Sequence, residues 1–216
     1  MNSNYTFSNT WCAYSELVNN LPNHVPTTSK VDILEVGIYE GASTAWFTHT
    51  YLNHNHESTL TSIDPFLSSD TISHVSSHTE RVFESNELLF PHKERRKIYR
   101  VKSEHFWSMP IHDKYDIIYL DGSHDSYDTY VDVLQCYLRL NDEGVLWIDD
   151  YLGGEVKHCG CKDDRLKQNI DKALRDLKAN QHGYDIIHKG YQLAIRKSNI
   201  VRTPDSYVQS ISSTVD

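Results

Sequence analysis

Short apolar runs alternate along this chain with longer stretches in which apolar residues recur at helical spacing. The runs of strand length are residues 31–36, 59–63, 98–101, 116–120 and 144–148. Helical patterns cover residues 42–52 and 80–90, then a segment with Tyr127, Val131, Leu134 and Leu138 on one face, and a segment with Leu166, Ile170, Leu174 and Leu177. Strand–helix alternation of this kind predicts an open, mostly parallel sheet with helices on both faces.

The end of the pattern differs from the rest. Residues 184–188 and 192–196 read as two strands joined by only three residues, which predicts a β-hairpin. One of the last two strands must therefore run antiparallel. The expected fold class is α/β, with a seven-stranded, mostly parallel, Rossmann-like sheet that ends in an antiparallel hairpin.

The chain divides into three parts on the same grounds. Residues 1–30 are largely polar, with Trp11, Tyr14, Leu17 and Leu21 at helical spacing, which predicts a helical cap segment. Residues 31–197 form the predicted main domain, and residues 198–216 a polar tail. The loops at 67–78 and 153–161 and the N-terminal helix are the expected lids and specificity elements of a site.

Charge and length narrow the choice of partners. With 21 Lys and Arg against 30 Asp and Glu, the net charge is −9, which argues against nucleic acid as the main partner. No apolar run approaches the ~20 residues of a membrane span, and the start lacks a signal-peptide pattern. We expect a cytoplasmic protein that acts on a small molecule or glycan. His158, Cys159 and Cys161 lack a second pair at finger-like spacing, so they do not predict a structural zinc site.

A glycine motif follows the first apolar run directly. The segment Glu35-Val36-Gly37-Ile38-Tyr39-Glu40-Gly41 opens the first helical stretch. A dinucleotide site would need a middle glycine so that the backbone can approach a pyrophosphate, and Tyr39 stands there instead. The segment resembles the E/D-x-G-x-x-x-G motif of the Rossmann-like (class I) S-adenosylmethionine-dependent methyltransferases, and the element order resembles that family from residue 31 to 196.

The resemblance implies a set of cofactor contacts. Gly37 and Gly41 would form the close turn, and Glu35 would anchor the amino-acid end of S-adenosylmethionine. Asp64, at the end of the second strand, can accept hydrogen bonds from the ribose hydroxyls. Ser103 and Glu104 lie just past the third strand, where this family contacts the adenine.

Three carboxylates follow the next two strands. Asp121 ends the fourth strand, and Asp149 and Asp150 end the fifth. Neighbouring strands lie about 4.8 Å apart, so these charges would repel unless a cation neutralises them. The pattern resembles the metal-dependent O-methyltransferases of the catechol and macrolide/aminocoumarin sugar branches, which implies Mg²⁺ or Mn²⁺. For both Asp149 and Asp150 to bind a metal, the chain must leave strand geometry there. Alternatively, Asp150 caps a turn while Asp121 and Asp149 line the cofactor pocket.

His124 is the candidate general base, with Asp121 beside it. It stands three residues after Asp121, where the catechol branch has a lysine base, and imidazole titrates near neutrality. These features predict a metal-assisted O-methyltransferase acting on a hydroxyl of a sugar or another polyhydroxylated acceptor. Three alternatives stay open: an NAD-dependent oxidoreductase, a cofactor-binding protein without catalysis, and a metal-independent methyltransferase that uses His124 alone.

Overall fold

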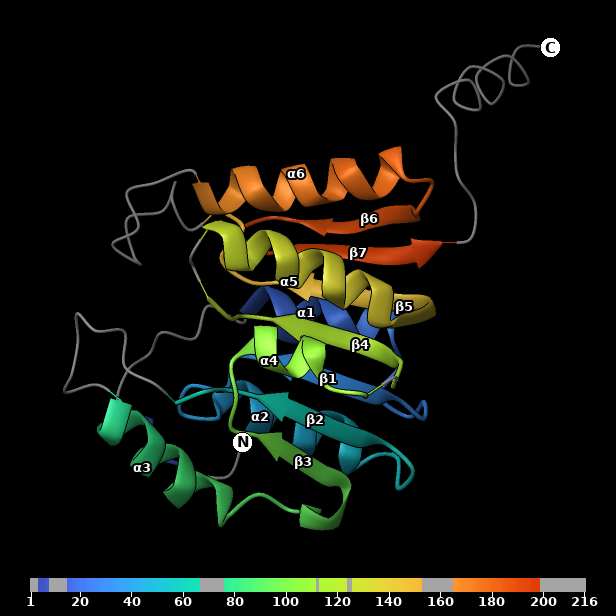
Figure 1. The fold of residues 1–216 in the computed structure, drawn as a ribbon. Helices are drawn as coiled ribbons and strands as arrows, with labels where there is room; N and C mark the ends of the chain where they lie inside the picture. The colour runs from blue at the N-terminus through green and yellow to red at the C-terminus, as the bar shows by residue number, and fades with distance from the viewer. Residues whose placement is uncertain are drawn as a thin grey trace.

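A computed structural model describes residues 4–7, 15–66, 76–111, 113–123, 126–152 and 165–198. Its centre is a seven-stranded sheet with the order β3-β2-β1-β4-β5-β7-β6 (Figure 1). The strands are β1 (Asp32–Val36), β2 (Thr59–Ile63), β3 (Arg96–Tyr99), β4 (Tyr115–Leu120), β5 (Leu140–Ile148), β6 (Gly183–Lys189) and β7 (Leu193–Ser198). Strands β1 to β5 pair in parallel, whereas β7 pairs antiparallel with both β5 and β6. The predicted sheet and its antiparallel terminal hairpin are therefore confirmed.

Helices cover both faces of the sheet. They are α1 (Ser15–His24), α2 (Ala42–Phe47) with a π-helical continuation at Thr48–Leu52, α3 (Ser76–Glu87), α4 (Ser103–Ser108), α5 (Ser126–Arg139) and α6 (Arg165–Ala179). Leu17 and Leu21 of α1 pack in one apolar cluster with α2 and one face of the sheet. Side chains of α4, α5 and α6, such as Phe106, Val133 and Ile170, pack against the other face.

Alternation along the strands assigns each side chain to one of these faces. In β4, Ile117 and Tyr119 belong to the cluster with α1 and α2, whereas Ile118 and Leu120 belong to the cluster with α5 and α6. In β5, Trp147 lies on the α1 side by the same rule. The alternation continues past the strand ends, and it decides which neighbours the site residues meet.

Helix α5 is placed as predicted, but its buried face is not. Tyr127 and Leu138, expected on the inner face, are 73% and 44% exposed. The buried stripe consists of Thr129, Asp132, Val133, Cys136 and Tyr137. The pattern of apolar residues does not reveal this stripe, because one of its members is the carboxylate of Asp132. Hydrogen bonds stabilise this side chain in the interior.

The short helix α4 was not predicted, and several expectations fall outside the described residues. Trp11 and Tyr14 of the cap segment lie there, as do the loop positions 67–75 and 153–164 and the tail from 199. Within the described ranges, none of the helices is long and apolar enough to cross a membrane.

Candidate functional site

Four of the predicted site residues lie in one row across the carboxyl edge of the sheet. Each is the first residue after a strand, and its N–H continues the ladder to the neighbouring strand. Asp64 donates to Tyr99 O (3.1 Å) and Gly37 to Ile63 O (2.9 Å). Asp121 donates to Val36 O (2.8 Å), and Asp149 donates to Leu120 O (2.9 Å). The predicted cofactor residues and the predicted acceptor-side carboxylates thus form one continuous edge.

The loop after β1 packs directly on the chain that leaves β4. Gly37 has φ +96°, and a Cβ placed on it would lie 1.8 Å from the carbonyl oxygen of Asp121. Only glycine allows this approach and this conformation. At the other end of the motif, Gly41 has φ +85° and faces the ring of Phe83, which a Cβ would approach to 2.8 Å. Both glycines of the motif are therefore required by the backbone path.

Asp64 holds two strained loops in place. Its Oδ2 accepts the N–H groups of Ile38 (2.8 Å) and Tyr39 (3.0 Å), and its Oδ1 accepts that of Phe66 (2.6 Å). Tyr39 and Phe66 both have positive φ, 52° and 48°, which non-glycine residues rarely adopt. A carboxylate offers about four acceptor positions, so Asp64 keeps capacity for a further donor.

Glu35 is fully buried beneath the glycine loop, on the α2 side of the sheet. Its carboxylate accepts hydrogen bonds from Ser43 Oγ (2.5 Å), Thr44 Oγ1 (2.8 Å) and Ser62 Oγ (2.6 Å). Burial raises the pKa of Glu35 to about 7, although these hydrogen bonds oppose the rise. The structure thus shows Glu35 tying α2 and β2 to the end of β1, just before the loop. Its predicted contact with the cofactor stays a prediction.

Ser103 and Glu104 begin α4, next to the row. Ser103 Oγ donates to Asp132 Oδ2 (3.1 Å), and Trp107 Nε1 donates to Asp132 Oδ1 (2.6 Å). Burial raises the pKa of Asp132 to about 6 against these hydrogen bonds. Asp132 therefore positions the helix on which the predicted adenine contacts lie. The sequence analysis missed it, because a single Asp within a helical pattern carries no signal of burial.

A buried phenol joins the two acceptor-side carboxylates of the row. Tyr119 Oη donates to Asp149 Oδ2 (2.5 Å) and lies 3.3 Å from Asp121 Oδ2. All three side chains follow the same strand alternation, which directs them to the α1 side of the sheet. Burial and the two negative charges raise the pKa of Tyr119 well above its ordinary value, so the phenol stays protonated. Burial also raises the pKa of Asp149, with Asp150 adding to the effect.

Asp150 departs from strand geometry, as a shared site for both aspartates requires. Its φ is +53°, and its Oδ1 accepts a hydrogen bond from Tyr191 Oη. Among the described residues, however, no group of three or more His, Cys, Asp and Glu is placed to hold a metal ion. The oxygen donors suit a hard cation, and hydrogen bonds to ligating carboxylates are common. Still, the three-aspartate ligand set predicted from the sequence is not assembled in this conformation.

A small cavity opens beside these carboxylates on the opposite side of the sheet edge. Asp121, Ser123 and Asp149 line it together with Leu166 and Ile170 of α6. His124 lies outside the described residues, so its predicted role as a base stays a prediction. Besides Asp132, sequence reasoning missed Tyr119 and Gln192, since neither Tyr in a strand nor a lone Gln signals a site.

The sheet order, the glycine loop after β1 and the acidic row define a Rossmann-like fold with a site of the methyltransferase type. A family model described as "Methyltransferase domain" matches residues 34–151. The chain belongs to this family, which confirms the resemblance stated from the sequence. No curated protein matches the chain.

Solved structures of low sequence identity share the fold. A protein from Klebsiella pneumoniae, provisionally described as an O-methyltransferase, has 16% identity and a TM-score of 0.63, with 89% of this chain and 84% of that chain covered. O-methyltransferase TomG from Streptomyces achromogenes, involved in tomaymycin synthesis and solved with S-adenosylmethionine, has 14% identity and a TM-score of 0.59 over 86% and 79%. An O-methyltransferase from Bacillus cereus, solved with S-adenosylhomocysteine, has 14% identity and a TM-score of 0.53 over 85% and 79%.

The raised pKa of Glu35 predicts a specific pH dependence of stability. The folded pKa of about 7 lies above the ordinary 4.5, so the protonated carboxyl favours the fold. This contribution to the free energy of unfolding is complete below about pH 4.5 and is lost as the pH rises to 7. The free energy of unfolding that is lost amounts to about 3 kcal/mol. Urea unfolding of Glu35→Gln should show a flatter pH profile than wild type over that window. Glu57→Gln makes the same chemical change at an exposed site and should keep the wild-type profile. If Glu35→Gln keeps it too, Glu35 does not titrate in the window.

Proposed function

We propose that this protein transfers a methyl group from S-adenosylmethionine to a hydroxyl oxygen of a small acceptor. The observation that carries the proposal is the continuous row of Asp64, Gly37, Asp121 and Asp149 across the carboxyl edge of the sheet. Ligands of open α/β sheets bind beyond this edge. The contact between Gly37 and the Asp121 backbone makes the cofactor half and the acceptor half of the row adjacent.

An NAD-dependent oxidoreductase is the weaker candidate. The loop after β1 carries Tyr39 at the position where a dinucleotide fingerprint has its middle glycine, and Tyr39 already adopts a positive φ. A side chain there obstructs the approach of a pyrophosphate, whereas S-adenosylmethionine has no phosphate. TomG, solved with S-adenosylmethionine, and the Bacillus cereus O-methyltransferase, solved with S-adenosylhomocysteine, support the same choice.

Cofactor binding provides the first test. Isothermal titration calorimetry should show binding of S-adenosylhomocysteine to the wild type, with NADH giving no signal. Asp64→Ala should weaken this binding by about tenfold or more, because it removes a charged acceptor and frees the loops at Tyr39 and Phe66. Asp142→Ala removes the same charge from an exposed position near the start of β5 and should bind normally. Binding of NADH in place of S-adenosylhomocysteine would reject the proposed function.

For the acceptor we propose a neutral sugar or another polyhydroxylated molecule, assisted by Mg²⁺ or Mn²⁺. Carboxylates accept hydrogen bonds from hydroxyl groups and disfavour anionic acceptors. Asp121, Asp149 and Asp150 would hold the metal once Asp150 releases Tyr191, and Tyr119 would support Asp149 as a hydrogen-bond donor. A bound divalent ion would supply charge stabilisation for the acceptor oxygen.

A methyl-transfer screen tests the acceptor class and the metal together. With radiolabelled S-adenosylmethionine, polyols and glycosides should be methylated in preference to catechols. EDTA should abolish transfer, and added Mg²⁺ should restore it. Full activity in EDTA would remove the metal from the reaction, and methylation of catechols alone would reject the polyol acceptor.

His124 is the proposed general base. In the sequence it stands four residues after the end of β4 and three after Asp121. A base in this role contributes ~10²–10⁴-fold to rate. We therefore expect His124→Ala to lower kcat by about that factor, to leave S-adenosylhomocysteine affinity intact, and to lose the rise of kcat with pH near neutrality. A variant that loses only a few-fold and keeps this pH limb would assign the base to another group.

A further inference from the structure

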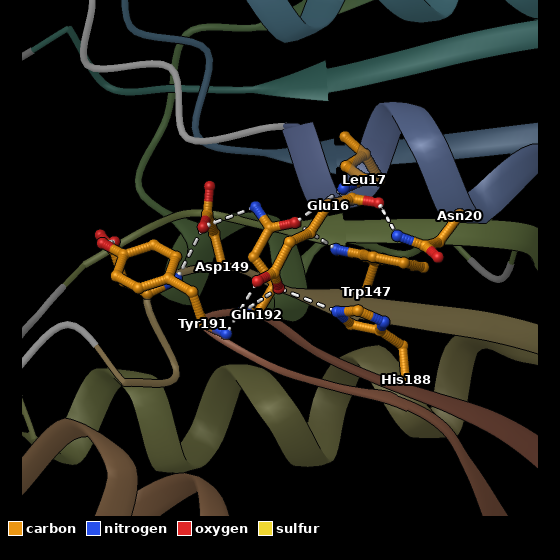
Figure 2. Close-up of polar contacts among 9 residues, drawn as sticks. Glu16, Leu17, Asn20, Trp147, Asp149, His188, Tyr191 and Gln192 are labelled. Carbon is orange, nitrogen blue, oxygen red and sulfur yellow. Dashed lines mark hydrogen bonds and ion pairs between the residues drawn. The ribbon is translucent and has the colours of Figure 1, made fainter. Parts of the chain in front are cut away.

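One buried amide links the first helix of the protein to the acceptor-side carboxylate Asp149. The side chain of Gln192, just before β7, has no solvent exposure. Its Oε1 accepts hydrogen bonds from the backbone N–H of Leu17 (3.0 Å) and from Trp147 Nε1 (2.7 Å). Its Nε2 donates to Asp149 Oδ1 (2.7 Å), as Figure 2 shows. Both the oxygen and the nitrogen of the Gln192 amide are therefore hydrogen-bonded.

The contact with Leu17 is part of the attachment of α1. Leu17 is the third residue of α1, and N–H groups in the first turn of a helix have no partner within the helix. The Gln192 oxygen satisfies one of them in the interior, where an unpaired N–H would be costly. The docked position of α1 and the orientation of the Gln192 amide are thus mutually dependent.

A second residue of α1 fixes the backbone of Gln192 from the other side. The carboxylate of Glu16 accepts the N–H groups of Tyr191 (3.1 Å) and Gln192 (2.8 Å), and it contacts His188 Nε2 at 2.8 Å (Figure 2). Gly190 passes so close that a Cβ on it would lie 2.7 Å from the Glu16 carboxylate. Glu16 therefore clamps the turn between β6 and β7 on which Gln192 stands.

At the other end, the amide restricts how Asp149 can point. Asp149 Oδ1 accepts from Gln192 and from the N–H of Asp150 (2.7 Å), while Oδ2 accepts from Tyr119. The donors lie on both oxygens, so they fix the plane of the carboxylate and not only its position. Loss of the Gln192 donor would leave one oxygen with a single local contact and would let the side chain rotate at χ1 and χ2.

We propose that Gln192 is a positioning residue that couples the docking of helix α1 to the orientation of Asp149 at the acceptor site. The inference rests on the proposed function, because that function gives Asp149 its role. Helix α1 then acts on methyl transfer through Asp149. Correct orientation of the reacting oxygen is worth orders of magnitude in rate, so a small rotation of Asp149 has a large kinetic effect.

The kinetic test separates positioning from general stability. Gln192→Met keeps the side-chain volume but removes the whole link, and it should lower kcat at least tenfold while the affinity for S-adenosylhomocysteine changes less than twofold. Gln192→Glu keeps an acceptor for Leu17 and Trp147 but lacks the amide donor, and it should show the same loss if Gln192→Met does not fold. Val31→Ala weakens the same apolar cluster and contributes no group to this link, so it should keep wild-type kcat. Wild-type kcat in a folded Gln192 variant would overturn the proposal.

Hydrogen exchange tests the coupling without any acceptor or metal. Asp149→Ala removes the partner of the Gln192 amide, so amide exchange in residues 15–24 should be several-fold faster than in wild type. Asp121→Ala, at the same sheet edge and also next to Tyr119, should leave exchange in α1 unchanged. Equal exchange of α1 in both variants would overturn the coupling. A wild type that binds no S-adenosylhomocysteine would instead reject the proposed function, and the exchange result would still decide whether the link exists.

Discussion

The carboxyl edge of the sheet depends on buried carboxyl groups whose hydrogen-bond donors are all neutral. Hydroxyls surround Glu35, backbone N–H groups surround Asp64, an indole and a hydroxyl hold Asp132, and a phenol and an amide hold Asp149. Such donors satisfy the oxygens but do not cancel charge, so burial raises the pKa of Glu35, Asp132 and Asp149, and each of these carboxyl groups adds a negative potential to the edge when it is ionised. That potential suits a cofactor whose reacting sulfur is cationic, and a divalent ion in addition. Since the positive charge disperses during methyl transfer, the attraction favours binding rather than rate.

In the proposed reaction, rate would then come from the placement of the acceptor oxygen, for which the orientation of Asp149 is the proposed determinant. Tyr119 and Gln192 fix both oxygens of Asp149, and strand alternation brings these side chains to one face. The same alternation would direct Asp150 to the other face, but its positive φ interrupts the strand. The backbone conformation of Asp150 therefore determines whether one or both of the aspartates that follow β5 can contact the same ligand.

Much of this arrangement could be predicted from the sequence, because it follows from the periodicity of apolar residues and from the order of strands and helices along the chain. The predicted strand at residues 59–63 and the predicted helix at residues 42–52 have the bounds that the structure shows. The three-residue connection at Gly190 predicts the hairpin. Topology alone then placed Asp64, Asp121 and Asp149 at one edge. The features that could not be predicted, α4 and the inner face of α5, have other causes. Helix α4 is too short to show a period, and the inner stripe of α5 contains Asp132, whose burial depends on a partner far along the chain.

The hydrogen-bond partners of the site residues could not be predicted for the same reason. Gln192 meets Leu17 across 175 residues of sequence, and Glu16 meets Gln192 across 176. Contacts of such separation leave no local pattern in the sequence, and each carries the entropy cost of joining distant segments. The amide donor to Asp149 is therefore in place only where α1 and the turn before β7 have met. The glycine loop and Asp64 depend on nearer contacts, at separations of 26 and 25 residues, whereas the orientation of Asp149 depends in part on a helix near the start of the domain and a turn near its end.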